Sequence, residues 1–489
     1  MKVFRTLAIV LLALQAAIGI ANAQAPFTAG SWTAINNAPP TGVGHVMLLT
    51  DGSVLAINSG CDATGNWYRL VPDKTGSYIN GKWSAAGTMP AGYNPLYFAS
   101  QVVPSGAVVV MGGEYNACNS VWTNLGALYS PWTNKWTSLA APAGWSSIGD
   151  AQSIILPNGK MMLANCCTTE EAILTLVAGV PTWASTGTGK ADWNDEEGWT
   201  MLPGGNILTV DTYVNSTCCG KGYQIYNPST GAWTTPSGTT VVNLVDASSS
   251  ELGPAALLPN GTVFAAGATT NNAVYTISTG KWASAPKFGG TLDIADGPAA
   301  VLPDGNLLLD TSPGVYKSGT RFFEWDGAAL HSVPAPGPNA PDDSSYYGHL
   351  VVLPTGQVMF TDFSSTVEIY TPAGAPCAGC APAITSVAST LTHGSVNNVI
   401  KGTQFNGVTQ GAYYGDDDQS FTNFPLVRIT DSSGRVWYCR THGWLGGVAT
   451  GTKIVSSEFD IPSSIALGAA TLEVVTNGIP SASVEVTID

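Results

Sequence analysis

The sequence predicts an all-β protein, a seven-bladed β-propeller followed by an immunoglobulin-like β-sandwich. Three observations lead to this prediction. A short turn phrase recurs seven times, its glycines 44 to 56 residues apart, and an aromatic–tryptophan phrase alternates with it. Both phrases stop before residue 380, and only alternating strand patterns follow. Recurrence at such a period is typical of propeller blades.

The turn phrase consists of apolar residues, a turn residue and glycine, followed by a β-rich run. Its copies end at Gly52, Gly106, Gly159, Gly205, Gly261, Gly305 and Gly356. Asp-Gly and Asn-Gly supply the positive φ angles that two-residue hairpin turns need. We therefore interpret each copy as the hairpin between two inner strands of one blade. Neighbouring runs such as 108–111 are wholly apolar, which is typical of fully buried strands.

The second phrase places tryptophan seven residues after an aromatic residue, as in Tyr129 to Trp136. We interpret it as the outer hairpin of a blade. Trp32 has the character of an outer strand but precedes the first inner hairpin, whereas the last repeat, at Tyr370, lacks its own tryptophan. The N-terminal strand is therefore predicted to complete the seventh blade and close the ring, which removes free sheet edges.

The predicted domains follow from these patterns. Residues 24–376 form the propeller, 377–382 a Pro/Gly/Ala linker and 383–489 the sandwich, whose strands include 426–429, 436–438 and 471–475. Residues 1–23 have the basic start, apolar run and Ala-Asn-Ala cleavage site of a signal peptide. No later segment has about 18 consecutive apolar residues. We expect a secreted protein, extracellular or periplasmic, without a membrane span.

Composition restricts the partners. The formal net charge is −15 and only 10% of the residues are charged. Nucleic acids and anionic membranes require clustered basic charge, so neither is expected as a partner. We expect a monomer whose partner is extracellular carbohydrate or a small-molecule substrate.

Nine cysteines in an exported chain favour disulfides over a zinc site. Cys377 and Cys380 are predicted to form a small staple in the linker. The vicinal pairs 166–167 and 218–219 occupy equivalent parts of successive repeats, so bridges between the two pairs are plausible. By the same logic Cys61 would pair with Cys118, which leaves Cys439 over.

A ring of chemically active residues is predicted at the mouth of the central tunnel, where the first strand of each blade begins. Counting nine residues back from each hairpin glycine gives Val43, Tyr97, Asp150, Glu196, Leu252, Asp296 and Tyr347, with His45, His349, Glu251 and Tyr346 within two residues of these positions. Carboxylates and imidazoles together suit Ca²⁺, Mn²⁺ or a transition metal. The alternative is that the acids cap turns and the histidines and tyrosines pack.

The chain resembles the galactose oxidase and glyoxal oxidase superfamily, in particular secreted bacterial kelch-repeat proteins with a C-terminal early-set domain. The phrases 76–83, 112–114 and 411–417 carry the resemblance, which spans the mature chain. It implies a kelch-type propeller and a copper ion held by two tyrosines and two histidines, with one tyrosine cross-linked to a cysteine. The matching positions here are Asp150 and Ala99 for that tyrosine and cysteine, and Tyr346 and Tyr347 for the Tyr-His pair.

The last family ligand is a histidine on a loop of the C-terminal domain, for which His442 is the match. It either enters the tunnel to meet Tyr346, Tyr347 and His349, or packs between the domains. Because Asp150 and Ala99 replace the cross-linked pair, we predict no copper-radical oxidation of galactose.

Two classes of function follow from these residues. The first is a carbohydrate-active or oxidoreductase-like enzyme at the tunnel mouth, with Asp150, Glu196, Asp296, Tyr346 and Tyr347 as catalytic candidates. His45, Tyr97 and Glu251 would bind the ligand, and His349 and His442 a metal. Copper is the cofactor that the resemblance implies, and Ca²⁺ is the one that the acids suit. The second class is a non-catalytic module that binds extracellular glycan or protein.

Overall fold

The structure, a computed structural model, describes residues 27–58, 65–177, 179–214 and 217–489. Strands dominate, and the only helix within these ranges is a short 3₁₀ turn, η1 (Ser345–Tyr347). No helix among the described residues is long and apolar enough to cross a membrane. The predicted all-β class is confirmed, whereas the predicted signal peptide lies outside the described residues.

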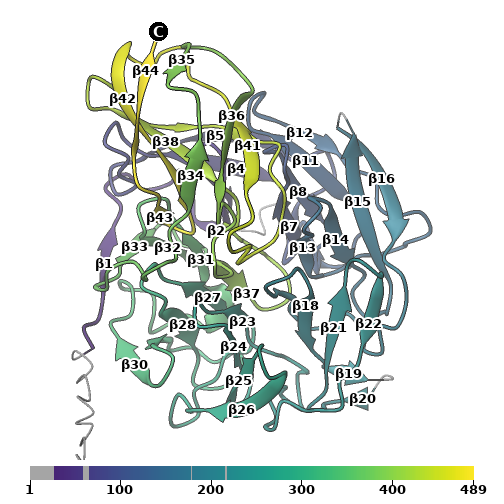
Figure 1. Ribbon diagram of the computed structural model, residues 1–489. Helices are drawn as coiled ribbons and strands as arrows, with labels where there is room; N and C mark the ends of the chain where they lie inside the picture. The colour runs from purple at the N-terminus through teal and green to yellow at the C-terminus, as the bar shows by residue number, and fades with distance from the viewer. Residues whose placement is uncertain (1–26, 59–64, 178, 215–216) are drawn as a thin grey trace, which may run out of the picture.

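Seven antiparallel sheets surround a common centre (Figure 1). Six of them have four strands, and the sixth in chain order has four strands of its own and a fifth from the C-terminal region. In chain order the first sheet contains β2–β5 (Val43–Leu48, Val54–Asn58, Asn66–Val71, Lys82–Thr88), and the second contains β7, β8, β11 and β12 (Ala99–Val102, Val108–Met111, Gly126–Ser130, Lys135–Ser138). The third contains β13–β16 (Ser153–Ile155, Met161–Ala164, Glu171–Val177, Val180–Ser185). The fourth contains β17, β18, β21 and β22 (Thr200–Met201, Ile207–Val210, Tyr223–Asn227, Ala232–Thr234). Short ribbons β6, β9 and β10 (Pro95–Leu96, Tyr115–Asn116, Asn119–Ser120) and β19 and β20 (Tyr213–Val214, Thr217–Cys218) project from them.

The remaining three sheets complete the ring. They contain β23–β26 (Ala255–Leu257, Thr262–Ala266, Asn272–Thr276, Lys281–Ala285), β27–β30 (Pro298–Val301, Leu307–Thr311, Arg321–Trp325, Leu330–Val333), and β31–β33 (His349–Val352, Val358–Thr361, Glu368–Thr371) with β1 (Ser31–Ala34). Trp32 of β1 lies opposite Tyr370 of β33. The prediction that the N-terminal strand completes the last sheet is therefore confirmed.

The local chemistry of both phrases explains these sheets. All seven phrase glycines have positive φ, between 75° and 95°. In the first copy the Gly52 amide donates to the Leu49 carbonyl and the Leu49 amide donates to Ser53, so the loop is longer than the predicted two-residue turn. In the outer hairpins Tyr129 lies opposite Trp136, as predicted, and the two rings pack 5.0 Å apart.

The C-terminal region folds as two facing sheets with their own apolar core. One contains β34, β36, β41 and β40 (Ala383–Ser386, Asn398–Thr403, Val455–Phe459, Thr441–His442), and the other β35, β44, β42, β38 and β39 (Thr390–Leu391, Val484–Ile488, Gly468–Thr476, Leu426–Thr430, Val436–Cys439), with β43 (Ile479–Pro480) beside β42. It packs against the inner hairpin turns, where Gly52 meets Tyr438. The immunoglobulin-like and kelch types and the domain boundaries stay predictions.

A segment of the C-terminal region passes into the centre of the propeller. We call residues 410–420 the central plug. Its strand β37 (Ala412–Tyr414) pairs with β27 of the sixth sheet. Further along, the Asp418 amide donates to the Phe98 carbonyl, and the Ser420 hydroxyl donates to Leu350 at 2.8 Å. The plug therefore joins inner strands of several blades.

Two predicted cysteine arrangements have outcomes in the structure. Cys377 and Cys380 form the expected disulfide. Cys218 is bonded to its neighbour Cys219, so the suggested bridges between the two vicinal pairs are wrong. Residues 166 and 167 hold their sulfur atoms 2.8 Å apart, as thiols. The suggested partner of Cys118, Cys61, lies outside the described residues.

Candidate functional site

A cavity of about 470 Å³ opens at the end of the tunnel where the first strands begin. Among the described residues, its wall contains carboxyl groups, tyrosines and one serine, and no lysine, arginine or histidine. The lining residues are Tyr97, Glu114, Tyr115, Asp150, Glu196, Ser249, Glu251, Asp296, Tyr316, Tyr346, Tyr414, Asp416 and Asp417. The predicted convergence of Asp150, Glu196 and Asp296 on one cavity is therefore confirmed.

The backbone turns these side chains inward at one repeated position. Tyr97, Glu196 and Asp296 each lie nine residues before a hairpin glycine, and their φ angles are 53°, 58° and 47°. Residues other than glycine rarely adopt such angles, which cost on the order of 1 kcal/mol or more each. Strain of this kind is concentrated at functional sites. Three blades therefore carry the same unfavourable conformation where their side chains meet the cavity.

The central plug supplies the floor of the cavity. Tyr414 donates a hydrogen bond to the Tyr346 carbonyl at 2.5 Å, and its neighbours Asp416 and Asp417 are 4% and 2% exposed. A run of three aspartates such as 416–418 would ordinarily lie in a solvated loop, but Asp416 and Asp417 are buried at the site. The sequence did not predict Glu114 and Tyr316 at the site, because neither lies near the position nine residues before a hairpin glycine.

The concentration of carboxyl groups changes their protonation. Burial raises the pKa of Asp150 to about 7. Burial, and next the charge of Glu251, raises the pKa values of Glu196 and Asp296 well above their ordinary range. For Asp416 the causes are burial and then the charge of Asp150. The cavity therefore holds carboxyl groups that remain protonated near neutrality unless a cation compensates their charge.

Three of these acids form a set that a cation can bind. One carboxylate oxygen each of Glu196, Asp296 and Asp416 lies within 4.8 Å of the others. Oδ2 of Asp416 is buried and has no hydrogen-bond partner among the described residues. Hard oxygen ligands of this kind suit Ca²⁺. Glu251 lies beside them and accepts a hydrogen bond from the Tyr316 hydroxyl.

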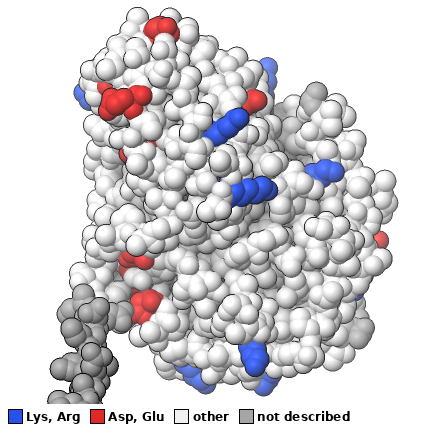
Figure 2. All heavy atoms as spheres, viewed as in Figure 1, with Lys and Arg blue, Asp and Glu red and all other residues white. Residues whose placement is uncertain are grey.

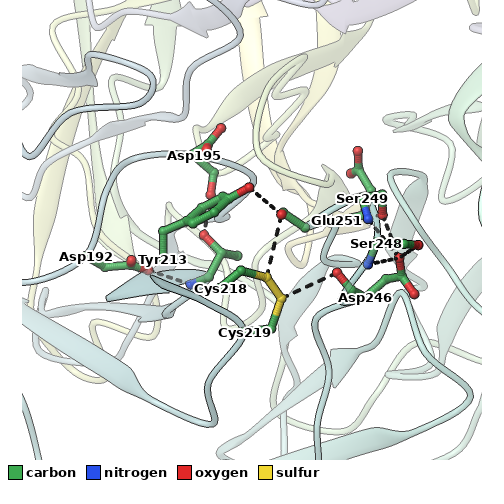
Figure 3. Close-up of a disulfide and its surroundings, with 11 residues drawn as sticks. Asp192, Asp195, Tyr213, Cys218, Cys219, Asp246, Ser248, Ser249 and Glu251 are labelled. Carbon is green, nitrogen blue, oxygen red and sulfur yellow. Dashed lines mark hydrogen bonds between the residues drawn. A yellow bond between two sulfur atoms is a disulfide. The ribbon is translucent and has the colours of Figure 1, made fainter. Parts of the chain in front are cut away.

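The wall behind Glu251 is stiffened by the vicinal disulfide (Figure 3). The Ser250 hydroxyl donates a hydrogen bond to the sulfur of Cys218 at 3.6 Å, and it also shares a hydrogen bond with the Tyr213 hydroxyl. The sulfur of Cys219 lies 3.5 Å from the Asp246 carbonyl. The disulfide thus supports the 246–251 segment that carries Ser249 and Glu251 into the cavity.

Other predicted site residues lie elsewhere. Tyr347 does not line the cavity, and its ring packs against those of Tyr346 and Phe363. His45 and His349 are buried beside the plug residue Asp418, and none of these three lines the cavity.

The prediction that His442 enters the tunnel is wrong. It lies on β40, with Nε2 3.1 Å from Asp460 and Nδ1 3.3 Å from Glu458. The preceding residue, Thr441, donates its amide to Thr50 in a propeller turn. His442 therefore lies where the sandwich meets the propeller, which was the alternative prediction, and the central plug is the segment that enters the tunnel.

A copper-radical centre does not fit these residues. Ala99 is wholly buried in β7 and has no sulfur to cross-link, and Asp150 offers a carboxyl group instead of a phenol. His442 is remote, and the plug brings aspartates to the site instead of a histidine.

Comparisons with known proteins show the fold. No family model matches the chain, and no curated protein matches its sequence. A fungal alcohol oxidase of the AA5 family, solved with copper, is 12% identical with a TM-score of 0.51, over 94% of this chain and 99% of that one. This similarity supports a galactose-oxidase-like propeller fold.

Two more distant structures also match. A streptogramin B lyase is 10% identical with a TM-score of 0.47, over 70% of this chain and 98% of that one. The extracellular domain of a hybrid two-component system from B. thetaiotaomicron is 10% identical with a TM-score of 0.46, over 94% of this chain and 60% of that one.

Proposed function

We propose that this is a secreted protein that binds neutral carbohydrate in the central cavity and acts on it through carboxyl groups. The observation that carries the proposal is the lining itself, seven carboxyl groups and five tyrosines around one cavity of about 470 Å³. Carboxylates accept hydrogen bonds from sugar hydroxyls, and tyrosine rings offer flat apolar faces with a polar edge. The described lining of the cavity has no cationic side chain, which disfavours anionic glycans.

Asp150 is the residue best suited to acid–base work. A pKa of about 7 allows its carboxyl group to donate a proton and take it back near neutral pH. Enzymes that cleave glycosidic bonds use a pair of carboxyl groups whose environments separate their pKa values. Asp417, buried in the plug, and Glu114, whose charge acts on Asp150, are the acids available as partners of Asp150.

Glu196, Asp296 and Asp416 have a different role in this proposal. They would hold Ca²⁺, which when bound supplies a positive centre for sugar hydroxyls. The ion would also keep the three carboxyl groups ionised. Asp150 is not one of these three ligands, but the charges of Asp150 and Asp416 act on each other, so a bound ion would also favour the ionised form of Asp150.

The test is a panel of neutral oligosaccharides, measured by titration calorimetry in Ca²⁺ and in EDTA and by the appearance of new reducing ends. We expect binding in Ca²⁺, and turnover that Asp150→Asn abolishes while binding persists. Asp73→Asn, which removes a carboxyl group from an exposed propeller loop, is the matched control and should behave as the wild type. Absence of binding in both buffers would refute the proposal.

The alternative function is a non-catalytic extracellular glycan- or protein-binding module. The five tyrosines favour it, because a stacking platform needs no acid. Binding without turnover, at equal affinity in wild type and Asp150→Asn, would establish it.

A further inference from the structure

A second cluster of ligand-type side chains lies beside the cavity, where the plug meets the first and last blades. His45 on β2, His349 on β31 and Asp418 of the plug are each 1 to 2% exposed. One ring nitrogen of each histidine and one carboxylate oxygen lie within 4.8 Å of one another. We propose that these three residues bind a divalent first-row transition-metal ion. The site is independent of the carbohydrate proposal and uses none of the positions that the galactose oxidase resemblance assigns to copper.

The hydrogen bonds of His349 leave a lone pair directed at a carboxylate. Its Nδ1 lies 3.2 Å from the Tyr347 carbonyl, which only accepts hydrogen bonds, so Nδ1 carries the hydrogen. In the neutral ring Nε2 then holds a lone pair. This Nε2 lies 3.1 Å from Oδ2 of Asp418, which is also an acceptor. A positive centre must lie between them, either a proton on the ring or a metal ion.

The hydrogen bonds of His45 lead to the same requirement. The Ser100 hydroxyl donates its one hydrogen to the Gln419 carbonyl at 2.8 Å, so it accepts from Nε2 of His45, 2.9 Å away. Nδ1 of His45 then holds a lone pair, and it is buried without a hydrogen-bond partner among the described residues.

A metal ion accounts for more of these features than an ion pair does. A protonated His349 beside Asp418 would satisfy two of the three residues and leave the buried His45 nitrogen without a partner. Two imidazoles and one carboxylate are a ligand set that Mn²⁺, Fe²⁺, Co²⁺ and Zn²⁺ accept. Metal-binding histidines typically donate the other ring hydrogen to a carbonyl or similar acceptor, as the Tyr347 carbonyl and the Ser100 hydroxyl accept here.

The position of the cluster gives the ion a structural consequence. Asp418 belongs to the C-terminal region, whereas the two histidines belong to the blades where the ring closes. A bound ion would therefore fasten the central plug to the junction of the ring. It would also hold Asp416 and Asp417 in place on the floor of the cavity, because they directly precede Asp418.

The test uses the full mature protein, stripped with EDTA, loaded separately with Zn²⁺, Co²⁺ and Mn²⁺ and passed through a desalting column before metal analysis. We expect about one equivalent of Zn²⁺ or Co²⁺ to be retained, and ligand-field absorption bands from Co²⁺. His349→Ala and Asp418→Asn should lose the ion and the bands. His331→Ala is the matched control and should keep the ion and the bands. His331 lies on the outer strand β30, and its Nε2 is 2.8 Å from a carboxylate oxygen of Asp326.

Three outcomes would overturn the proposal. Folded wild-type protein could retain none of the three ions, in which case His349 and Asp418 form a plain ion pair. His349→Ala could retain the ion as well as wild type does. Asp296→Asn, in the acidic cavity, could lose the ion while Asp418→Asn keeps it. If the alanine variant does not fold, His45→Gln provides the same comparison, and loss of the wild-type Co²⁺ bands on return to EDTA checks reversibility.

Discussion

Replacing Asp150 with asparagine tests the electrostatics of the cavity directly. The carboxyl group has an ordinary pKa of 3.8 and a pKa of about 7 in the folded protein, because it is buried. A folded-state pKa above the unfolded value stabilises the fold fully below the unfolded pKa, and this stability is lost as the pH rises through the folded value. The contribution of Asp150 is therefore present at pH 4 and absent above pH 8.

The magnitude follows from the size of the shift. A rise from 3.8 to about 7 corresponds to at most about 4 kcal/mol, of which roughly 2 to 3 kcal/mol is lost between pH 5 and pH 8. Asparagine cannot ionise, so Asp150→Asn should reduce the fall in unfolding free energy between these two pH values by roughly 2 to 3 kcal/mol. Urea unfolding followed by tryptophan fluorescence, with EDTA present, measures this difference.

The control is Asp73→Asn. The Thr75 hydroxyl lowers the pKa of Asp73, so its carboxyl group is ionised in both folded and unfolded chains from pH 5 to pH 8. This variant should keep the pH dependence of the wild type. Identical pH dependence in Asp150→Asn and wild type would refute the reasoning, because it would mean that Asp150 is already ionised at pH 5 in the folded protein.

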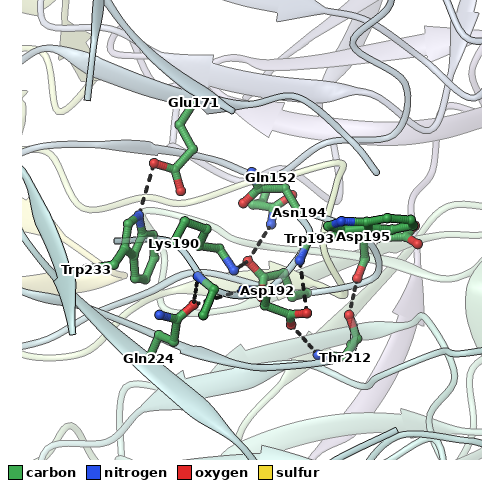
Figure 4. Close-up of polar contacts among 12 residues, drawn as sticks. Gln152, Glu171, Lys190, Asp192, Trp193, Asn194, Asp195, Thr212, Gln224 and Trp233 are labelled. Atoms are coloured by element: carbon green, nitrogen blue, oxygen red, sulfur yellow. Dashed lines mark hydrogen bonds and ion pairs between the residues drawn. The ribbon is translucent and has the colours of Figure 1, made fainter. Parts of the chain in front are cut away.

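Three further predictions concern the cation, a buried ion pair and ring closure. Ca²⁺ at 100 times its dissociation constant should stabilise the wild-type fold by about 2.7 kcal/mol at pH 8, and by less at pH 5, where protons compete for the carboxylates. The Asp416→Asn variant should gain almost no stability from Ca²⁺, and thermal melts measure both effects. Lys190→Met should destabilise the fold by about 3 to 5 kcal/mol. The reason is that the Lys190 ammonium group is buried 2.8 Å from the Glu197 carboxylate and beside Asp192 (Figure 4), so its loss leaves buried acids without their cation. A urea midpoint equal to that of the wild type would contradict this ion-pair prediction. Trp32→Ala should cost about 2 kcal/mol, since its ring packs on Phe322, Phe360 and Tyr370, and a melting temperature equal to that of wild type would show that β1 does not stabilise the ring.

Charged side chains are sparse on the face of the molecule drawn in Figure 2, where they are scattered over a largely uncharged surface. The acids of the cavity count toward the formal net charge of −15 without forming an exposed acidic patch on that face. Binding at the cavity is therefore expected to depend on pH and Ca²⁺ more than on ionic strength.

Local chemistry made the fold predictable. Each turn phrase specifies its own hairpin, because glycine adopts positive φ without a steric penalty. The phase of Trp32 relative to the turn phrases was enough to predict ring closure, since a strand lacking inner neighbours must find them elsewhere. The same repeat frame placed Asp150, Glu196 and Asp296 correctly, because equivalent positions in successive blades face the same tunnel.

Long-range contacts made the rest of the site unpredictable. The central plug reads locally as a polar loop, and only its pairing with β27 brings Asp416 and Asp417 into the cavity. For His442 the sequence left two positions open, the tunnel, which the family resemblance implies, and the interface between the domains. Its partners are Glu458 on β41 and Asp460 directly after that strand, and no sequence pattern distinguishes the two arrangements.

The most direct test of the central claim is a crystal structure of the protein with Ca²⁺ and a neutral oligosaccharide that binds in solution. The account predicts sugar density in the central cavity, with hydroxyl groups near Glu251 and a ring face against Tyr97 or Tyr346. The chain has another cavity of about 560 Å³, lined by Tyr93, Trp145 and neighbouring loops. Sugar bound there or on the C-terminal sandwich, with the acidic cavity empty, would contradict the account.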